Sequence, residues 1–445
     1  MSNVFYLSAS KNYPEAVRAE GVWIWDGDGK RYMDGSGGAC VVSIGHGVAE
    51  VRAAALAQMD AISFAHRSQF TTAACEELSR RVAALSPDPE LDRVHFVSGG
   101  SEAVESAVKL ARHYWRAVGR PDRYKVISRW TSYHGNTAGA LALGGHTGRR
   151  SPYQPLILHT PHVEPCYCYR CPYGRTPADC GLLCAEALDR AISYEGPESV
   201  AAFIAEPVVG ATAGALVPPD GYWQRVREIC DRHQILLIAD EVMTGAGRTG
   251  KPLALEHWGV HADLVVLAKG LSSGYAPLGA VLVRRAIHDA VRDGSGGFTH
   301  GHTYGQHPVA AAVGAAVLRY LEEHALVARS ARLGAHLLER LREMADHPLV
   351  GDVRGLGLFA GVELVADKDS REPFEARHKV AAKVAAAAFA RGLITYPGDG
   401  GADGIRGDHL LLCPPFCVTE EEIGFLVQTL GEALDDGAAA LRRQR

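Results

Sequence analysis

The sequence contains no long apolar run and no block of like charges. No stretch reaches the roughly 18 consecutive apolar residues that a membrane-spanning helix needs. Residues 1–21, MSNVFYLSASKNYPEAVRAEG, have neither the cationic start nor the apolar centre of a signal peptide. Acidic and basic residues are interspersed and the net charge is −5, so neither a nucleic-acid partner nor a membrane partner is expected.

Common nucleotide-binding fingerprints are also missing. The sequence has neither a Walker P-loop nor a GxGxxG motif, which argues against a nucleotide-binding regulator. Ten cysteines among 445 residues do not make a disulfide scaffold. We therefore expect a globular protein of the reducing cytoplasm, long enough to bury a core of considerable size.

Short apolar runs alternate with helical patterns in the middle of the chain. Helical patterns occupy residues 102–119 and 222–233. The apolar runs lie at 93–98, 125–130, 156–160, 200–207, 235–240, 264–269 and 279–283. This alternation predicts an α/β fold in which helices flank a mostly parallel, seven-stranded sheet.

The two ends of the chain have a different character. Residues 22–34, VWIWDGDGKRYMD, predict a β-hairpin around the DGDG turn. Apolar spacing predicts helices at 48–60, 72–85 and 308–345, and residues 351–435 return to short strands and helices. We expect an N-terminal segment (1–60), a large domain (61–310), and a connecting helix with a small α+β domain (311–445), to which both chain ends contribute.

Residues suited to catalysis or ligand binding follow the apolar runs. In an open parallel sheet, ligands bind beyond the carboxyl ends of the strands, so these positions are expected to converge. They are Gly99, Gly100 and Ser101 after the first run, Tyr133 and His134 after the second, Glu206, Asp240 and, at the end of LVVLA, Lys269.

Each of these positions also has an ordinary structural interpretation. Lys269 either extends to the surface at a strand end, or is a desolvated amine ready to form a Schiff base. Asp240 either caps a helix or pairs with Arg248, or it faces a cationic ring nitrogen. Residues 99–101 form a simple turn or a phosphate cup at a helix start. The functional interpretations together are the parts that pyridoxal phosphate requires.

Six ordered segments of the sequence resemble the class III aminotransferases. They are FVSGGSEAVESAVKLAR, YHGNTAGAL, AEPVVG, ADEVMTGAGRTG, LAKGLSSGYAPLGAVL and HTYGQHPVAAA. The resemblance covers nearly the whole chain and implies pyridoxal 5'-phosphate, the fold of aspartate aminotransferase (fold type I) and a ping-pong transamination. An ω-amine or amino acid would be the donor, and a keto acid or aldehyde the acceptor. The alternative is another reaction on the same fold: that of an aminomutase, a racemase or epimerase, or a decarboxylase.

The resemblance also implies a role for each matching residue. Lys269 would form the Schiff base and move the substrate proton, Asp240 would hold the pyridine nitrogen, and Glu206 would act near the substrate or behind it. Thr303 would reach the phosphate of a neighbouring subunit, which implies a homodimer with shared active sites, alone or paired into a tetramer. The remaining cofactor contacts would come from Val242 and Tyr133 on the two ring faces, His134 beside them, and Gly99, Gly100 and Ser101 at the phosphate.

Three departures from the family pattern concern the substrate. Ala39 and Cys40 stand where many relatives carry a bulky aromatic, which predicts a roomier pocket. Arg406 lies closer to the GDH motif than the carboxylate-binding arginine of those relatives, and Met243 replaces a glutamine found in several amino-acid-specific members. All three argue against a strict amino-acid transaminase, without naming the substrate.

A cysteine cluster lies outside this pattern. It comprises Cys166, Cys168, Cys171, Cys180 and Cys184. Four thiolates could bind zinc or an iron–sulfur cluster, and a metal or redox sensor with an idle cofactor site is a rival function. The spacing matches no standard finger, so we favour a tyrosine-rich loop with free thiols and predict no metal. His300 and His302 form an H-x-H pair, which we assign to the cofactor-contact segment instead.

Overall fold

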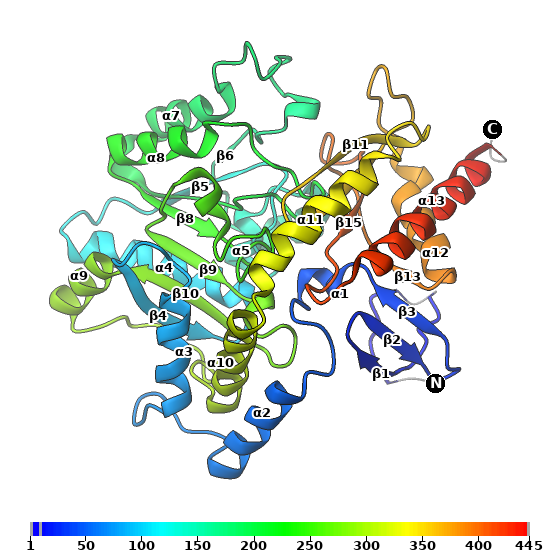
Figure 1. The fold of residues 1–445 in the computed structure, drawn as a ribbon. Helices are drawn as coiled ribbons and strands as arrows, with labels where there is room; N and C mark the ends of the chain where they lie inside the picture. The colour runs from blue at the N-terminus through cyan, green and yellow to red at the C-terminus, as the bar shows by residue number, and fades with distance from the viewer. Residues whose placement is uncertain (1–2, 9–10, 443–445) are drawn as a thin grey trace.

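The computed structural model describes residues 3–8 and 11–442, and within them a seven-stranded sheet forms the centre (Figure 1). Its order is β4 (Leu91–Val97), β10 (Gly279–Arg284), β9 (Leu264–Leu267), β8 (Leu236–Asp240), β7 (Val200–Ala205), β5 (Lys125–Arg129) and β6 (His162–Val163). Only β10 among these strands runs antiparallel to its two neighbours, β4 and β9. The predicted mostly parallel sheet of seven strands is confirmed.

The central strands are apolar throughout because both of their faces are covered. All six residues of β7 are buried. Ile204 and Ile238 share an apolar cluster with α4 (Gly100–Ala117), whereas Phe203 and Leu237 share another with α8 (Tyr222–His233). Successive side chains of a strand point to opposite faces, so continuous apolar runs are what a doubly covered sheet needs.

One predicted strand is wrong. Residues 151–156 form a 3-10 turn, and the edge strand β6 lies at 162–163 rather than 156–160. Leu156 and Leu158 are 77% and 78% exposed, so this apolar run packs against no sheet face. Pro155, within the turn, has no amide hydrogen to donate to a strand ladder.

Both chain ends build the second, smaller domain. In one sheet the N-terminal strands β1 (Ala16–Glu20), β2 (Trp23–Asp26) and β3 (Arg31–Asp34) are joined by β13 (Leu393–Ile394), which pairs with β3 in parallel. The predicted hairpin is β2–β3. A second sheet has the order β11 (Val350–Gly355), β12 (Ala360–Leu364), β15 (Asp408–Leu412) and β14 (Tyr396–Gly398).

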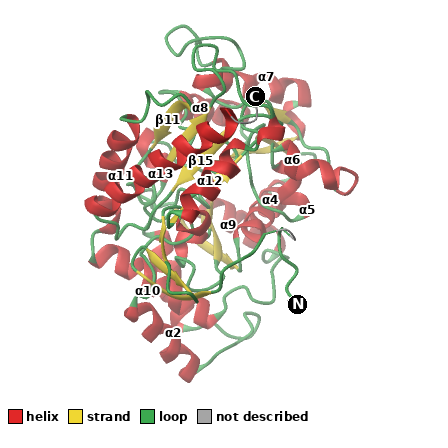
Figure 2. Cartoon of the chain, turned by 90° about the vertical axis from the view of Figure 1, so that its right-hand side faces the viewer, coloured by secondary structure: helices red, strands yellow, loops and turns green. Residues whose placement is uncertain are grey.

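Helices connect and cover these sheets (Figure 2). Their bounds are α1 (Gly37–Cys40), α2 (Ala49–Ala61), α3 (Ala73–Ala83), α5 (Ala138–Leu143), α6 (Thr147–Arg150), α7 (Leu183–Glu195), α9 (Arg285–Ser295), α10 (Pro308–Glu323), α11 (Leu326–Arg342), α12 (Val380–Ala390) and α13 (Glu420–Arg442). The predicted helix 308–345 is two helices, broken where Ala325 takes a φ of +48°. The predicted boundaries at 60 and 310 fall inside α2 and α10, and the ends of the chain lie outside the described residues, so the three-part division stays a prediction.

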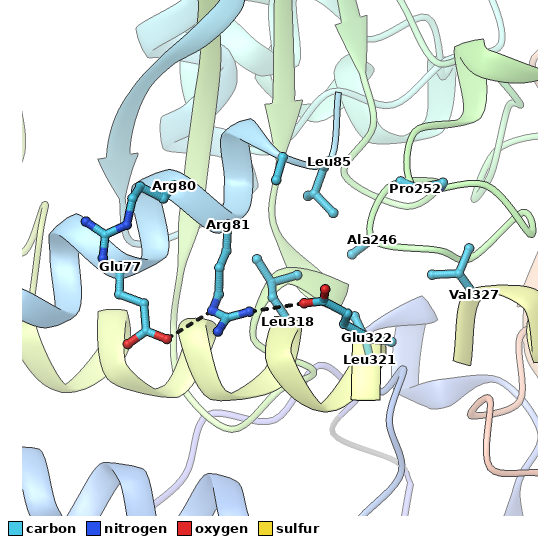
Figure 3. A pocket seen from close by; sticks show the side chains of 11 residues that line it. Glu77, Arg80, Arg81, Leu85, Ala246, Pro252, Leu318, Leu321, Glu322 and Val327 are labelled. Carbon is cyan, nitrogen blue, oxygen red and sulfur yellow. Dashed lines mark hydrogen bonds and ion pairs between the residues drawn. The ribbon is translucent and has the colours of Figure 1, made fainter. Parts of the chain in front are cut away.

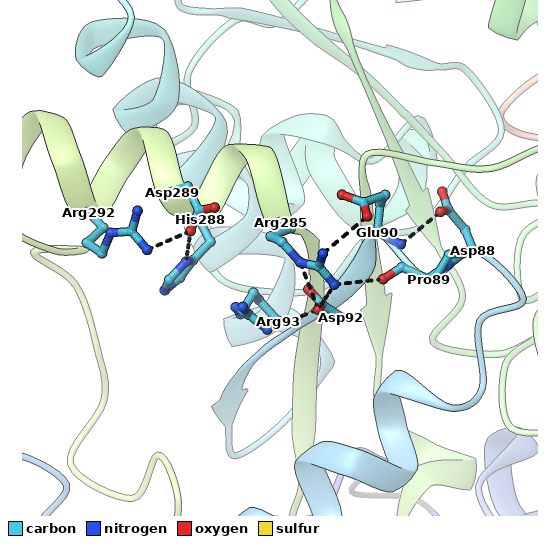
Figure 4. A network of polar contacts seen from close by, with 9 residues as sticks. All are labelled: Asp88, Pro89, Glu90, Asp92, Arg93, Arg285, His288, Asp289 and Arg292. Carbon is cyan, nitrogen blue, oxygen red and sulfur yellow. Dashed lines mark hydrogen bonds and ion pairs between the residues drawn. The ribbon is translucent and has the colours of Figure 1, made fainter.

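Charged pairs fasten α9 to the sheet edge (Figure 4). Arg285, the first residue of α9, pairs with Asp92 at 2.5 Å and with Glu90 at 3.2 Å, both at the β4 end of the sheet. Arg285 is 40% exposed, so water screens these pairs and they contribute little to stability. The antiparallel ladder of β4 and β10 joins the same edge through backbone hydrogen bonds. Within residues 3–8 and 11–442, no helix has both the length and the apolar character to cross a membrane.

Candidate active site

Polar side chains meet at the carboxyl edge of β7, β8 and β9, as expected. Asp240 is the last residue of β8, and its Oδ2 lies 2.6 Å from Nδ1 of His134, which follows β5. The backbone N–H of Val242 donates to Asp240 Oδ1 at 3.1 Å. Both side chains are buried, and Asp240 pairs with His134 rather than with Arg248. The carboxylate is therefore fixed from two sides.

Glu206 positions its neighbours. Its Oε1 accepts from the Tyr133 N–H at 3.0 Å, and its Oε2 accepts from the Gly210 N–H at 2.9 Å. Burial raises the pKa of Glu206, and the charge of Asp240 acts in the same direction. Since both carboxylate oxygens are engaged by backbone amides, Glu206 acts by holding Tyr133 and the loop that begins at Gly210.

Lys269 lies on a strained turn directly beyond β9. It opens the 3-10 turn Lys269–Leu271 with a φ of +43°, a conformation that L-residues adopt only when their surroundings hold it. Burial lowers the pKa of the partly buried amine to about 8, while Asp240 and Glu206 act in the opposite direction. Ser273 Oγ fastens the turn by accepting from the backbone N–H groups of Ser43 (2.8 Å) and Ile44 (3.1 Å).

The start of α4 is a tight, glycine-lined cup. The helix begins at Gly100, two residues before the predicted Glu102, and Gly99 precedes it. A Cβ added at Gly100 would lie 3.1 Å from Val242 Cγ1 and 3.6 Å from Ala268, the residue before the lysine. Free N–H groups at a helix start favour an anion. This anion cup therefore lies beside Val242, two residues after the carboxylate Asp240, and Ala268, one residue before the amine Lys269.

These residues fit pyridoxal phosphate. The cup suits its phosphate, Asp240 suits a protonated ring nitrogen, and Lys269 supplies an amine of lowered pKa. The buried Nε2 of His134 has no hydrogen-bond partner among the described residues, although its other nitrogen is engaged by Asp240. A polar atom left in that state is typical of a site built for a further group.

The remaining predicted site residues are placed as follows. Thr303 is exposed, in a turn beyond His302. Arg406 pairs with Asp403 and Glu372, each at 2.8 Å. Its guanidinium is therefore engaged by carboxylates of this chain itself.

Cys40 does not present a free side chain to the pocket, because it is bonded to Cys413. The two residues are 2% and 0% exposed, and together with Met243 and Phe359 they belong to one apolar cluster. The sequence offered no reason to pair two cysteines 373 positions apart. The other eight cysteines are free.

The five clustered cysteines line one small cavity. Within residues 3–8 and 11–442, no group of three or more His, Cys, Asp or Glu side chains is placed to hold a metal ion. Burial raises the pKa of Cys168 to about 11 and that of Cys184 to about 12. In this metal-free chain these two thiols are protonated at neutral pH.

Sequence reasoning missed Arg149 at this site. The residue is the third of the four in helix α6, and its guanidinium carbon lies 4.5 Å from the centre of the Tyr133 ring. No apolar run precedes Arg149, so the rule that pointed to strand ends could not find it. Its position over Tyr133 depends on the folded loop between β5 and β6.

A surface cavity of about 560 Å³ lies elsewhere, between α3 and α10 (Figure 3). At its charged rim, Arg81 pairs with Glu77 at 3.0 Å and with Glu322 at 3.3 Å. Those charges neutralise one another, and the cavity contains none of the predicted site residues. The strand-end cluster therefore remains the candidate active site.

Comparison with known proteins identifies a family for the chain. Residues 7–434 match the family described as Aminotransferase class-III. An uncharacterised aminotransferase of Bacillus subtilis, YodT, is 40% identical over 96% of each chain. Putrescine–pyruvate aminotransferase of Pseudomonas aeruginosa is 38% identical over 96% of this chain and 91% of that one.

Solved structures show the same relationship. An (S)-enantioselective omega-transaminase from Thermomicrobium roseum superposes with a TM-score of 0.90 at 38% identity, covering 97% of this chain and 96% of that one. An amine transaminase from an uncultivated Pseudomonas species, in its PLP-bound form, gives 0.91 at 37% identity over 98% and 99%. Class III aminotransferases depend on pyridoxal phosphate. The chain belongs to the class III aminotransferases and is a PLP-dependent enzyme of that family.

Proposed function

We propose that this enzyme moves an amino group from an ω-amine or amino acid donor to a keto acid or aldehyde acceptor, with ping-pong kinetics. The observation that carries the proposal is the grouping of the Lys269 amine, the Asp240 carboxylate and the Gly100 helix start at one sheet edge. The printed activities of two relatives, a putrescine–pyruvate aminotransferase and an omega-transaminase, support an amine donor.

The chain would hold pyridoxal phosphate with residues from four elements. The start of α4, with Gly99, Gly100 and Ser101, would bind the phosphate, and Asp240 would bind the ring nitrogen. Val242 and Tyr133 would pack on the two ring faces. When bound, the cofactor supplies an electron-withdrawing ring that stabilises negative charge on the substrate carbon losing its proton.

Lys269 would carry the proton between atoms during the reaction. With a pKa of about 8, its amine can both accept and release a proton near neutral pH. The turn that bears it is fixed by Ser273, so the amine stays close to its target. His134 and the Val242 N–H would keep Asp240 oriented, and Glu206 would keep Tyr133 in place.

The apolar cluster beside the site supports an ω-amine with a hydrocarbon body. Met243 directly follows Val242, and it packs with Phe359, Leu411 and the Cys40–Cys413 pair. These side chains are at most 7% exposed, so the cluster would act as an apolar wall behind Met243. A carboxylate placed against that wall would lose its hydration without a partner. A donor that is apolar beyond its amine would not suffer this loss.

We also propose a homodimer with shared active sites. Thr303 is exposed, and its neighbour Tyr304 packs edge-on against Phe64 at 6.2 Å between ring centres. Several apolar side chains near Phe64 are also exposed: Leu56, Met59, Ile62 and Phe70. Exposed apolar groups gathered in this way are typical of a surface that a partner covers. Thr303 would then meet the phosphate held by the partner subunit.

The test is the Lys269→Ala variant. It should lose the long-wavelength absorbance that the wild type shows with pyridoxal phosphate, and its turnover should fall roughly 10³-fold or more. Lys125→Ala is the matched control. Lys125 pairs with Glu195 and is the first residue of β5, so it lies at the opposite end of that strand from the site. Wild-type turnover in the Lys269 variant would refute the assignment.

The need for an amino acceptor distinguishes transamination from the rival reactions on the same fold. An aminomutase, a racemase or a decarboxylase turns over with a single substrate. Transamination should stop after one equivalent of donor when no keto acid or aldehyde is present. Continued turnover without an acceptor would show that the proposed reaction is wrong.

A further inference from the structure

We propose that Arg149 binds the carboxylate of a keto acid acceptor. This inference rests on the proposed function and names the group that the acceptor presents to this site. It starts from two arginines, one in α6 and one in the loop before β15 that packs against α6, of which only Arg406 is already surrounded by carboxylates.

Arg406 is the neutralised arginine. Its Nε lies 2.8 Å from Asp403, and its Nη1 lies 2.8 Å from Glu372 and 3.5 Å from Glu375. Three carboxylates already surround this one guanidinium. A substrate carboxylate would have to displace at least one of them and would enter a negatively charged setting.

Arg149 has no ion-pair partner in the part of the chain that the structure describes. Asp399, the nearby acid, lies 3.5 Å from His146, and its side chain is 82% exposed. The hydrogen bond to His146 and, more weakly, the charge of Arg149 lower the pKa of Asp399, but no ion pair joins Arg149 and Asp399 among the described residues. Arg149 itself is only partly exposed. A half-buried guanidinium without a carboxylate is unusual, because such groups are normally paired.

The place of Arg149 is defined by the site itself. Its guanidinium lies 4.5 Å from the centre of the Tyr133 ring, and Tyr133 is in turn held by Glu206. Its charge also reaches Lys269, since Arg149 is one of the groups that lower the pKa of that amine. The cation therefore lies within electrostatic range of the reacting nitrogen.

The loop before β15 lies against the helix that bears Arg149. A Cβ at Gly404 would lie 2.6 Å from Thr147 Oγ1, and a Cβ at Gly400 would lie 3.1 Å from His146 Nε2. His146 also hydrogen-bonds the Asp399 carbonyl at 3.0 Å. This packing holds α6 in place, so Arg149 is presented from a supported element.

The chemistry of the two half-reactions explains why an unpaired cation is useful here. An ω-amine donor carries no carboxylate, whereas a keto acid acceptor does, and both use the same site in turn. The planar guanidinium matches a carboxylate through two parallel hydrogen bonds. While the donor occupies the site, the Arg149 guanidinium would be stabilised by its cation–π contact with Tyr133.

The test compares two acceptors that differ in their carboxylate. In Arg149→Gln, kcat/KM for pyruvate should fall roughly 10- to 100-fold, because hydrogen bonds to a charged group are lost. The value for acetaldehyde should change less than about threefold. Arg149→Lys should recover part of the pyruvate activity, since the charge returns without the planar fork.

Arg406→Gln tests the competing assignment. An equal loss for both acceptors in Arg149→Gln, or no loss, overturns the proposal. It is also overturned if Arg406→Gln lowers the pyruvate value selectively while Arg149→Gln does not.

A binding measurement separates this inference from the proposed function. Calorimetric titration of the cofactor-free protein with propionate, against propionamide, compares the charged and uncharged forms of one small ligand. Propionate should bind more tightly to the wild type than to Arg149→Gln, and propionamide should bind both alike. If the wild type transfers no amino group to any acceptor, the proposed function fails. If it does, but Arg149→Gln changes neither the ratio of kcat/KM for pyruvate and acetaldehyde nor the ratio of affinities for propionate and propionamide, only this inference fails.

Discussion

At the scale of single residues, the site depends on one amine whose surroundings disfavour its charged form. Burial removes Lys269 from water, which costs the ammonium more than the neutral amine. Asp240 and Glu206 oppose this effect, and the resulting pKa is about 8 instead of 10.5. The amine is therefore partly uncharged at neutral pH and can act as a nucleophile.

This pKa predicts how the cofactor-free enzyme captures pyridoxal phosphate. Capture needs the uncharged amine, so its rate should rise with pH and level off once the pH has passed about 8. Stopped-flow absorbance between pH 6 and 10 measures it. A rate that is still climbing at pH 10 would mean that the lysine keeps its ordinary pKa of 10.5.

At the scale of elements, the beginning of α4 decides whether a phosphate can approach. Gly100 has no side chain where Val242 and Ala268 come close, so the helix start and the lysine-bearing strand can lie together. A larger residue would separate the two parts that must hold one cofactor. The helix is 18 residues long, which gives its N-terminus a substantial dipole.

Gly100→Ala should therefore weaken cofactor binding. The new Cβ would be 3.1 Å from Val242 Cγ1. Overpacking of this kind costs about 1–3 kcal/mol, which corresponds to a roughly 5- to 150-fold increase in Kd. Gly424→Ala in α13 is the control, because a Cβ there meets nothing within 4 Å. Titration of the cofactor-free variants with pyridoxal phosphate measures both. An unchanged Kd for Gly100→Ala would contradict the close-packed cup.

Three segments far apart in the sequence are also tied together next to the lysine turn. Buried Arg248 donates to the carbonyls of Val42 (3.0 Å), Leu358 (3.1 Å) and Pro414 (2.7 Å). Burial lowers the pKa of this arginine to about 9. The Cys40–Cys413 bond joins two of the same segments covalently.

At the scale of the whole molecule, this bond closes a loop of nearly the entire chain. The two cysteines are separated by 373 positions, and a crosslink between distant residues removes conformational freedom mainly from the unfolded state. Both sulfurs are buried, which limits the access of thiol reductants. Such a bond can persist where exposed disulfides would be reduced.

Loss of the crosslink should destabilise the protein measurably. Cys413→Ser should lower the free energy of unfolding by about 2–4 kcal/mol, as measured by denaturant unfolding without reductant. Cys417→Ser, which removes a free thiol four residues further on, is the control. Unfolded wild type should titrate eight thiols before reduction and ten after it. Ten thiols before reduction would show that the bond does not form.

The proposed dimer makes a second prediction at this scale. Phe70 is 67% exposed beside the Phe64–Tyr304 contact, so Phe70→Glu should place a charge in the interface and yield monomers by light scattering. Tyr194→Glu changes a residue that is 83% exposed at the end of α7, far from α2 in Figure 1, and should not alter the mass. If Phe70→Glu has the same mass as the wild type, this surface is not the interface.

The sequence predicted most of the large domain because its signals are local. Apolar runs mark strands that are covered on both faces, and the residue type just beyond each run identifies the chemistry of the sheet edge. It missed β1, β11, β13 and β14, which are two to six residues long and form only against partners from elsewhere in the chain. The strand expected at 156–160 failed for the same reason, since nothing covers its leucines.

The sequence by itself determined which residue types stand at the strand ends, and hence the amine, the carboxylate and the glycine-lined helix start of the site. The tertiary structure alone decided that Cys40 bonds to Cys413, that Arg406 is already paired, and that Arg149 stands over Tyr133 without an ion-pair partner among the described residues. The reason is physical: hydrogen bonds and apolar periodicity act between near neighbours along the chain, whereas pairing of charges and sulfurs depends on distances that exist only after the loops have folded together.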